Sequence, residues 1–130
     1  MFEIGNLRKA RWWSTFIVTT AILWLTLAPH PLPDNDVKWF EGADKIVHAL
    51  MFFALTCAAI FDFSLNGKKT GILKVFIISL CVAVFAALDE WAQGAMGLGR
   101  STDIFDFIAD CTGIIIAAFL CAAIIIINRP

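Results

Sequence analysis

Four long apolar runs, separated by short polar segments, set the pattern of this sequence. The runs cover residues 12–28, 46–61, 72–88 and 104–127. Their apolar residues do not alternate with polar ones, as those of a half-buried strand would. A helix needs about 20 apolar residues to cross a bilayer, and backbone polar groups in lipid must be paired within the segment. We therefore predict an all-α membrane protein, a bundle of four transmembrane helices over approximately residues 12–29, 45–62, 71–93 and 103–127.

Two of the runs need comment. The second run is the shortest, so we expect its helix to recruit polar flanking residues or to lie in a locally thinned bilayer. The first run follows Arg8, Lys9 and Arg11, as the apolar core of a signal peptide would. Because it is long, and because Pro29 follows it in place of a small-residue cleavage site, we expect a retained helix.

Composition supports the membrane prediction. Hydrophobic residues make up 60% of the 130 residues and charged residues only 16%, whereas soluble domains are about 25% charged. The length predicts a single domain, residues 1–130, and no basic patch suits a nucleic acid. Four cysteines lie within the apolar runs without metal-ligand spacing, so we expect them to be packing residues: Cys57, Cys81, Cys111 and Cys121.

The Lys and Arg residues predict how the helices are oriented. Seven flank one side of the predicted bundle: Arg8, Lys9, Arg11, Lys68, Lys69, Lys74 and Arg129. Three flank the other side: Lys38, Lys45 and Arg100. Because cytoplasmic segments carry the excess of positive residues, both termini are predicted to be cytoplasmic.

The acidic residues have the opposite distribution. Glu3 and Asp62 fall on the inner side and receive no role. The other nine of the eleven lie at the predicted outer face: Asp34, Asp36, Glu41, Asp44, Asp89, Glu90, Asp103, Asp106 and Asp110. Because the orientation rule reads Lys and Arg rather than acids, this distribution is separate information about the outer face.

Helical spacing brings several of these acids together with other polar side chains. Asp44 and His48 lie four residues apart at the start of the second helix, as do Asp89 and Gln93 at the end of the third. The fourth helix opens with three acids on one face: Asp103, Asp106 and Asp110. The last of them lies about 10 Å deeper than the first, and ionisable residues at such depth face a bundle interior or a wet cavity. We therefore predict a polar pocket between helices two, three and four.

The charge of this pocket predicts bound cations or protons. Six carboxylates face two permanent cations, Lys45 and Arg100, when His48 is neutral. A partly buried site cannot hold that excess of negative charge unneutralised. Oxygen ligands suit a divalent ion such as Mg²⁺, Ca²⁺ or Mn²⁺. The expected metal ligands are three of these acids: Asp89, Asp106 and Asp110.

Simpler roles explain part of the pattern. Asp44 and Asp103 are equally explained as residues that cap or stabilise helix N-termini, and the Ser-Thr pair at 101–102 as the cap of the fourth helix. Capping explains Asp106 poorly and Asp110 not at all. Three further residues also have simple structural alternatives. His48 could form a hydrogen bond with Asp44, Gln93 an interhelical hydrogen bond, and Arg100 a salt bridge.

Short motifs lie at the predicted outer ends of the helices: D-K-I-V-H at residues 44–48, with Phe52 after it, and D-E-W-A-Q at residues 89–93. The first resembles the D-K-x-x-H-x-x-x-F motif of the VanZ-like family of small integral membrane proteins, and the second resembles the D-E-x-x-Q motif of that family. Further residues fall where its R…D…N-x-x-G segment would put them: Arg100, Asp106 and Gly113. Asp110 departs from the pattern, because the family usually has Asn there.

The resemblance implies a multi-pass protein of the bacterial cytoplasmic (inner) membrane, with its active face outward and a role in the cell envelope. The family is named for glycopeptide resistance, notably to the antibiotic teicoplanin. The resemblance does not supply a reaction.

The first functional hypothesis is a binding or accessory protein. Its outer pocket would hold a lipid-linked envelope precursor or a lipid headgroup, directly or through a divalent cation such as Mg²⁺ or Ca²⁺. Arg100 and Lys45 would contact phosphate. Glu90, Gln93 and Asp103 would complete the binding site. Its partners would be membrane lipids, and short helices of this kind also favour association into a homo-oligomer.

The alternative is a metal-assisted hydrolase or transferase that acts on a lipid-linked envelope substrate. His48 would be the general acid/base, oriented by Asp44, with Lys45 and Arg100 at the same catalytic site to stabilise developing charge. No known nucleophile motif accompanies these residues. The third hypothesis is an ion or proton-coupled transporter, which intramembrane acids allow. Polar residues at only one end of the helices argue against a complete path.

Overall fold

The computed structural model describes residues 12–28, 42–66, 69–97 and 101–130. Their regular structure is entirely helical: α2 spans Trp13–Leu27, α3 Ala43–Leu65, α4 Ile72–Ala95 and α5 Ile104–Ile127. The predicted all-α class is confirmed, and each apolar run forms one helix. All four cysteines are free, three of them partly buried and Cys81 exposed.

Helix length separates α2 from the other three helices. With 23, 24 and 24 residues, α3, α4 and α5 are long and apolar enough to cross a membrane, because a rise of 1.5 Å per residue gives about 35 Å. α2 has 15 residues and spans only about 22 Å. Three spans are therefore supported, and the fourth stays a prediction. α3 recruits polar flanks, as predicted for the short second run, because both Asp44 and Asp62 lie within it.

The N-termini of α3 and α5 are capped differently from the way the sequence suggested. α3 begins after Gly42, whose φ of 86° is left-handed, and no side chain caps it. Asp44 therefore does not cap this helix. α5 is capped by Asp103, whose Oδ1 accepts a 2.8 Å hydrogen bond from the Phe105 N–H. The cap is thus the acid itself rather than the Ser-Thr pair before it.

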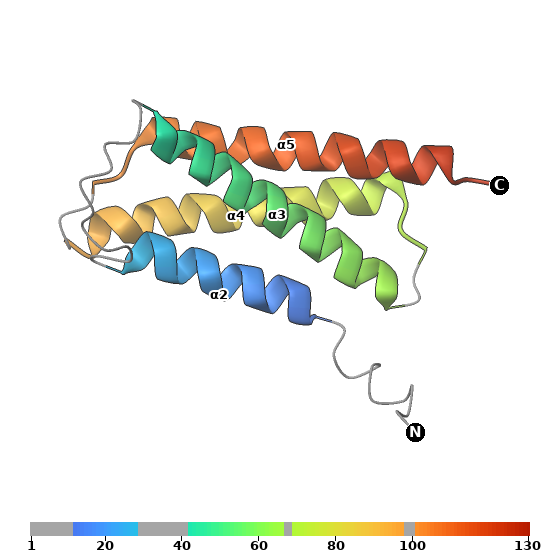
Figure 1. Ribbon diagram of the computed structural model, residues 1–130, viewed down its shortest axis with the longest axis horizontal. Coiled ribbons are helices and arrows are strands. Elements are labelled where there is room, and N and C mark those ends of the chain that lie inside the picture. The colour runs from blue at the N-terminus through green and yellow to red at the C-terminus, as the bar shows by residue number, and fades with distance from the viewer. Residues whose placement is uncertain (1–11, 29–41, 67–68, 98–100) are drawn as a thin grey trace, which may run out of the picture.

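The helices alternate in direction, so that α3 and α5 run one way and α2 and α4 the other (Figure 1). α3 and α5 make the most extensive contact in the bundle. Gly113 of α5 lies against α3, where a Cβ atom would be 2.9 Å from the carbonyl carbon of Ala49. The absence of a side chain at Gly113 lets the two backbones approach closely, and this places the first turns of α3 and α5 side by side.

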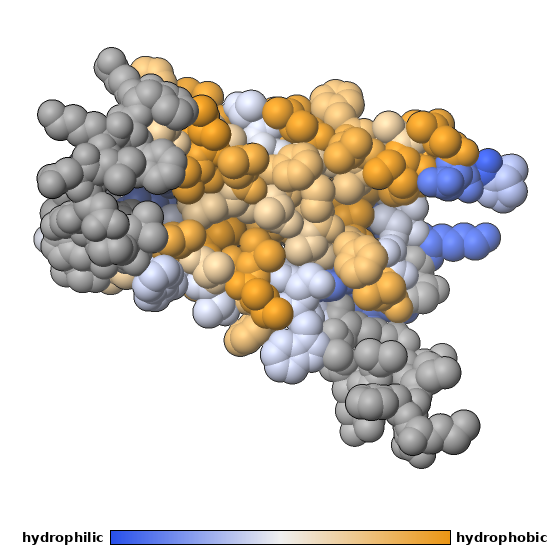
Figure 2. Space-filling model, viewed as in Figure 1, coloured by the Kyte–Doolittle hydropathy of each residue, from blue (hydrophilic) through white to orange (hydrophobic). Residues whose placement is uncertain are grey.

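The interior of the bundle is apolar through its middle. Its core consists of six buried side chains from all four helices: Ile22, Phe52, Leu55, Val82, Ala86 and Ile114. Large apolar side chains also cover the outside of the helices, and Figure 2 shows them as a broad band over the middle of the molecule. An apolar exterior around an apolar core is what contact with lipid requires.

Candidate functional site

Polar side chains gather at the end of the bundle where α3 and α5 begin and α4 ends. We call this group the polar cluster: Lys45, His48, Asp89, Glu90, Gln93, Asp103, Asp106 and Asp110. Five of its members are buried: His48, Asp89, Glu90, Gln93 and Asp110. The structure therefore brings residues of helices two, three and four together, as the sequence predicted. Arg100 lies outside the described residues.

His48 is held by two carboxylates from α5. Its Nδ1 lies 2.9 Å from Asp110 Oδ1, and its Nε2 lies 3.8 Å from Asp106 Oδ2. Asp110 is completely buried. The partner that orients His48 is thus Asp110, and not Asp44 one turn away as the sequence suggested. Asp44 is exposed, and its carboxylate contacts the Lys45 ammonium instead.

Lys45 sits among three carboxylates at the rim of the polar cluster. Its Nζ lies 3.1 Å from Asp106, 3.3 Å from Asp44 and 3.4 Å from Asp103. An ammonium group has three donors, so these contacts use its full capacity. Lys45 therefore holds these three carboxylates together at the rim, and its predicted contact with phosphate stays a prediction.

Glu90 joins the end of α4 to the start of α5. Its Oε2 accepts a 3.2 Å hydrogen bond from the Asp103 N–H, and its Oε1 accepts a 3.4 Å bond from Gln93 Nε2. The Thr102 hydroxyl donates to the Glu90 backbone carbonyl at 3.2 Å. A Cβ atom on Gly94 would lie 3.3 Å from the Thr102 Cβ, so glycine makes room for this contact. Glu90 is consequently fixed and 4% exposed.

Asp89 faces α2 rather than the other acids. Its Oδ1 accepts a 2.9 Å hydrogen bond from the Thr26 hydroxyl, and its Oδ2 accepts a 3.3 Å bond from Gln93. Thr26 is 1% exposed. Sequence reasoning did not identify Thr26, although its position in the last turn of an apolar helix, level with the predicted acids, was a signal. Asp89 therefore attaches α2 to α4.

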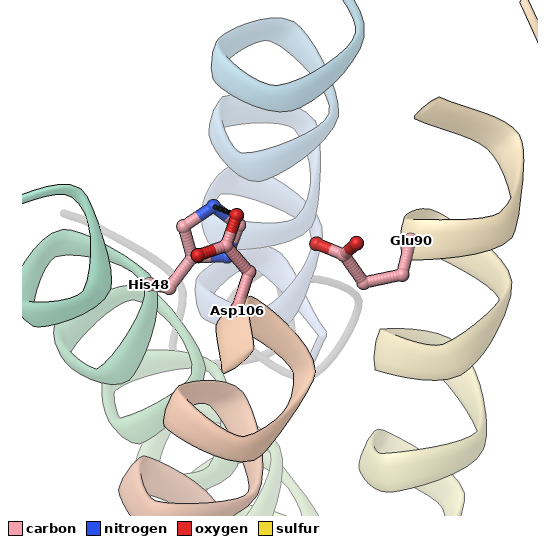
Figure 3. Close-up of side chains that lie close together, drawn as sticks. All are labelled: His48, Glu90 and Asp106. Atoms are coloured by element: carbon pink, nitrogen blue, oxygen red, sulfur yellow. Dashed lines mark ion pairs between the residues drawn. The ribbon is translucent and has the colours of Figure 1, made fainter. Parts of the chain in front are cut away.

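The residues able to share one metal ion are His48, Glu90 and Asp106, which we call the triad. One ligand atom from each lies within 4.8 Å of the other two. Figure 3 shows the three side chains converging from α3, α4 and α5. Of the expected ligands, only Asp106 belongs to the triad. Asp89 is turned toward Thr26, and Asp110 contacts the other ring nitrogen of His48.

Asp62 forms a second buried polar site at the opposite end of the bundle. Its Oδ2 accepts 2.8 Å hydrogen bonds from both the backbone N–H and the hydroxyl of Thr15. Thr15 lies in the first turn of α2, which has no side-chain cap of its own, so α3 supplies the cap. The sequence contained a signal: Asp62 continues a stripe of buried α3 positions at helical spacing. That stripe is His48, Phe52, Leu55, Ala59 and Asp62.

Comparison with known proteins gives one finding. A family model described as VanZ/LLP1 matches residues 3–127 of the 130-residue chain. No curated protein and no solved structure matches the chain.

Proposed function

The chain belongs to the VanZ/LLP1 family, and from this premise we propose that its polar cluster binds the phosphate-bearing headgroup of a cell-envelope lipid or lipid-linked precursor. Membership and the three long apolar helices make it a VanZ-like membrane protein. The observation that carries the proposal is the triad, in which two carboxylates and an imidazole from three helices face one another.

The proposed orientation places the polar cluster at the outer face of the bacterial cytoplasmic membrane, with both termini inside and all four helices spanning. Basic residues at the far end of the bundle support it. Lys69 and Lys74 flank the start of α4, and Arg129 follows α5. The positive-inside rule assigns that end to the cytoplasm. α2 runs antiparallel to α3 and contacts both α3 and α4, which supports a further span (Figure 1).

Excess negative charge favours a cation between the cluster and its ligand. The five acids of the polar cluster, with Asp44 at its rim, lie here against the ammonium of Lys45 and the imidazole of His48. A bare phosphate would be repelled by these carboxylates, since like charges at short range are strongly unfavourable in a medium of low dielectric. A divalent cation held by carboxylates reverses that sign and presents a positive face to phosphate. Arg100 is proposed as a second phosphate contact.

Partial exposure supports an entrance for a ligand at the rim of the polar cluster. The side chains of Lys45 and Asp106 are 37% and 15% exposed, whereas that of Asp110 is 0% exposed. The cluster is therefore open at the first turns of α3 and α5 and closed beneath. An acyl or polyprenyl chain would then lie against the apolar outer surface while its phosphate reached the cluster from the membrane interface.

Lipid binding by the purified full-length protein tests the proposal. The probes are short-chain phosphatidic acid and a short polyprenyl phosphate, with a phosphate-free diacylglycerol as control, titrated in detergent with and without EDTA. We expect phosphate-dependent binding that weakens at least about tenfold in EDTA and in Asp106→Asn. Equal affinity for diacylglycerol, or phosphate binding unchanged in Asp106→Asn, would overturn it.

One observation favours the enzymatic alternative. The contact between His48 Nδ1 and buried Asp110 is the arrangement that fixes the tautomer of a catalytic histidine and leaves Nε2 to transfer a proton. Under this reading His48 is a general acid/base toward a lipid-linked substrate. Release of inorganic phosphate or transfer of the headgroup during the same titrations, lost in His48→Gln, would favour catalysis over binding alone.

A further inference from the structure

The triad differs in chemical type from the oxygen-only site that the sequence predicted. It offers one imidazole nitrogen and two carboxylate oxygens. Mg²⁺ and Ca²⁺ take oxygen ligands, whereas imidazole suits Zn²⁺ and its neighbours among the first-row transition ions. Sites that bind such ions and react keep three protein ligands and leave a further coordination position open. The composition of the triad fits that description.

Each of the three side chains also has a polar partner outside the triad. Asp110 binds Nδ1 of His48 at 2.9 Å, which leaves Nε2 toward Asp106. Lys45 binds Oδ1 of Asp106 at 3.1 Å, which leaves Oδ2 toward the imidazole. The Asp103 N–H and the Gln93 amide hold the carboxylate of Glu90. Outer partners that fix the orientation of metal ligands are a regular feature of metal sites.

Asp110 is the second, independent sign of a cation. It is 0% exposed, it is aimed at the imidazole of the triad, and its Oδ2 has no hydrogen-bond partner among the described residues. A buried carboxylate with an unsatisfied oxygen is unfavourable unless positive charge lies close by. A cation on Nε2 of His48 polarises the ring toward Asp110 and supplies that charge. The carboxylate–histidine–metal arrangement is the usual one in zinc proteins.

We propose that the triad binds one first-row divalent transition ion, of which Zn²⁺ is the type, through Nε2 of His48 and the carboxylates of Glu90 and Asp106. Asp110 is a positioning residue that holds the imidazole. The remaining coordination positions are left to water or a phosphate oxygen. This assignment deepens the proposed function and rests on it only for that phosphate.

Metal binding by the full-length protein in detergent tests the assignment without any lipid. The probes are Zn²⁺ by calorimetry and Co²⁺ by visible absorption, with Mg²⁺ and Ca²⁺ in parallel. We expect one equivalent of Zn²⁺ to bind at least about 100-fold more tightly than Mg²⁺. His48→Ala and Glu90→Gln each lower the Zn²⁺ affinity by more than about 100-fold, and Asp110→Asn lowers it by about 10–100-fold.

Two carboxylates outside the triad serve as matched controls. Asp62→Asn changes a buried carboxylate at the far end of the bundle, and it should leave Zn²⁺ affinity unchanged. Asp89→Asn separates the two ligand sets, because Asp89 belongs to the oxygen-only site but not to the triad. Loss of Zn²⁺ binding in Asp89→Asn, with the helical content of the protein retained, would overturn the assignment.

The proton NMR spectrum of the Co²⁺-loaded wild-type protein tests imidazole ligation even if a variant fails to insert. A ligating His48 gives a paramagnetically shifted, exchangeable ring N–H proton, whose exchange with solvent is slow because Asp110 accepts its hydrogen bond. The absence of that resonance in the wild type would overturn the assignment. Binding of lipid phosphate without binding of Zn²⁺ would overturn this assignment and keep the proposed function. Binding of Zn²⁺ without binding of lipid phosphate would keep the assignment and overturn the proposed function.

Discussion

The two ends of this bundle bury carboxylates in different ways. At one end, Asp62 Oδ2 receives two 2.8 Å hydrogen bonds from a single residue, Thr15. At the other end, Asp110 Oδ2 is the one buried side-chain oxygen or nitrogen without a partner in the described part of the chain, and two further acids, Asp89 and Glu90, are buried at the same end. A carboxylate matched by donors stabilises a fold, whereas an excess of carboxylates over donors is unfavourable until a ligand arrives. Asp62 therefore has the character of a structural group and Asp110 that of a site.

The largest effect is expected where the two backbones that carry the site touch. Gly113→Ala places a methyl group against the backbone of Ala49, and neither helix backbone can yield easily. We expect a loss of about 3 kcal/mol in the free energy of unfolding, measured by thermal or denaturant unfolding in detergent, and loss of Zn²⁺ binding because His48 and Asp110 separate. Gly71→Ala is the control, since nothing lies within 4 Å of the added atom. Equal stability of the two variants would contradict the close approach.

The second prediction concerns the matched carboxylate. Asp62→Ala leaves the N–H and hydroxyl of Thr15 without their acceptor and removes the cap of α2. We expect a destabilisation of about 2 kcal/mol, seen as a lower unfolding temperature. Thr15→Val, which removes only the hydroxyl, should have about half that effect. A stable Asp62→Ala protein would show that α2 does not depend on this cap.

The unmatched carboxylate should respond in the opposite direction. Asp110→Asn retains an oxygen that accepts from His48 while it removes one buried negative charge. We expect the metal-free protein to become more stable by about 1 kcal/mol, even as its affinity for Zn²⁺ falls. Unfolding with and without Zn²⁺ measures both quantities. Destabilisation of the metal-free variant would remove the contrast between the two ends.

The smallest effect is expected at the rim of the polar cluster. Asp44 is exposed, and its contact with Lys45 is a surface ion pair. Asp44→Asn should change the unfolding free energy by no more than about 0.5 kcal/mol. A Zn²⁺ titration of the same variant should differ little from the wild type. A loss of metal binding would instead place Asp44 in the site, as the sequence alone had suggested.

The fold was largely predictable, because apolar run length determines helices in lipid. Membership of the site was also predictable, since helical spacing placed Asp103, Asp106 and Asp110 on one face. Pairing was not. Periodicity gives the face of a residue on its own helix but not which neighbour it meets, so His48 was assigned to Asp44 rather than to Asp110. The close approach at Gly113 decides that pairing, and it depends on how α3 and α5 pack.

α2 is fastened at both ends, by Thr15 to Asp62 of α3 and by Thr26 to Asp89 of α4. A transmembrane segment usually answers a change of bilayer thickness by tilting. Because these hydrogen bonds lie so far apart along a 15-residue helix, α2 cannot tilt or slide without breaking one of them. If α2 crosses the membrane as the proposed fourth span, the lipids must adapt to the protein, and the bilayer beside α2 is expected to be thinner than that around α4 and α5. A polar headgroup would be drawn deeper at that location than anywhere else around the bundle.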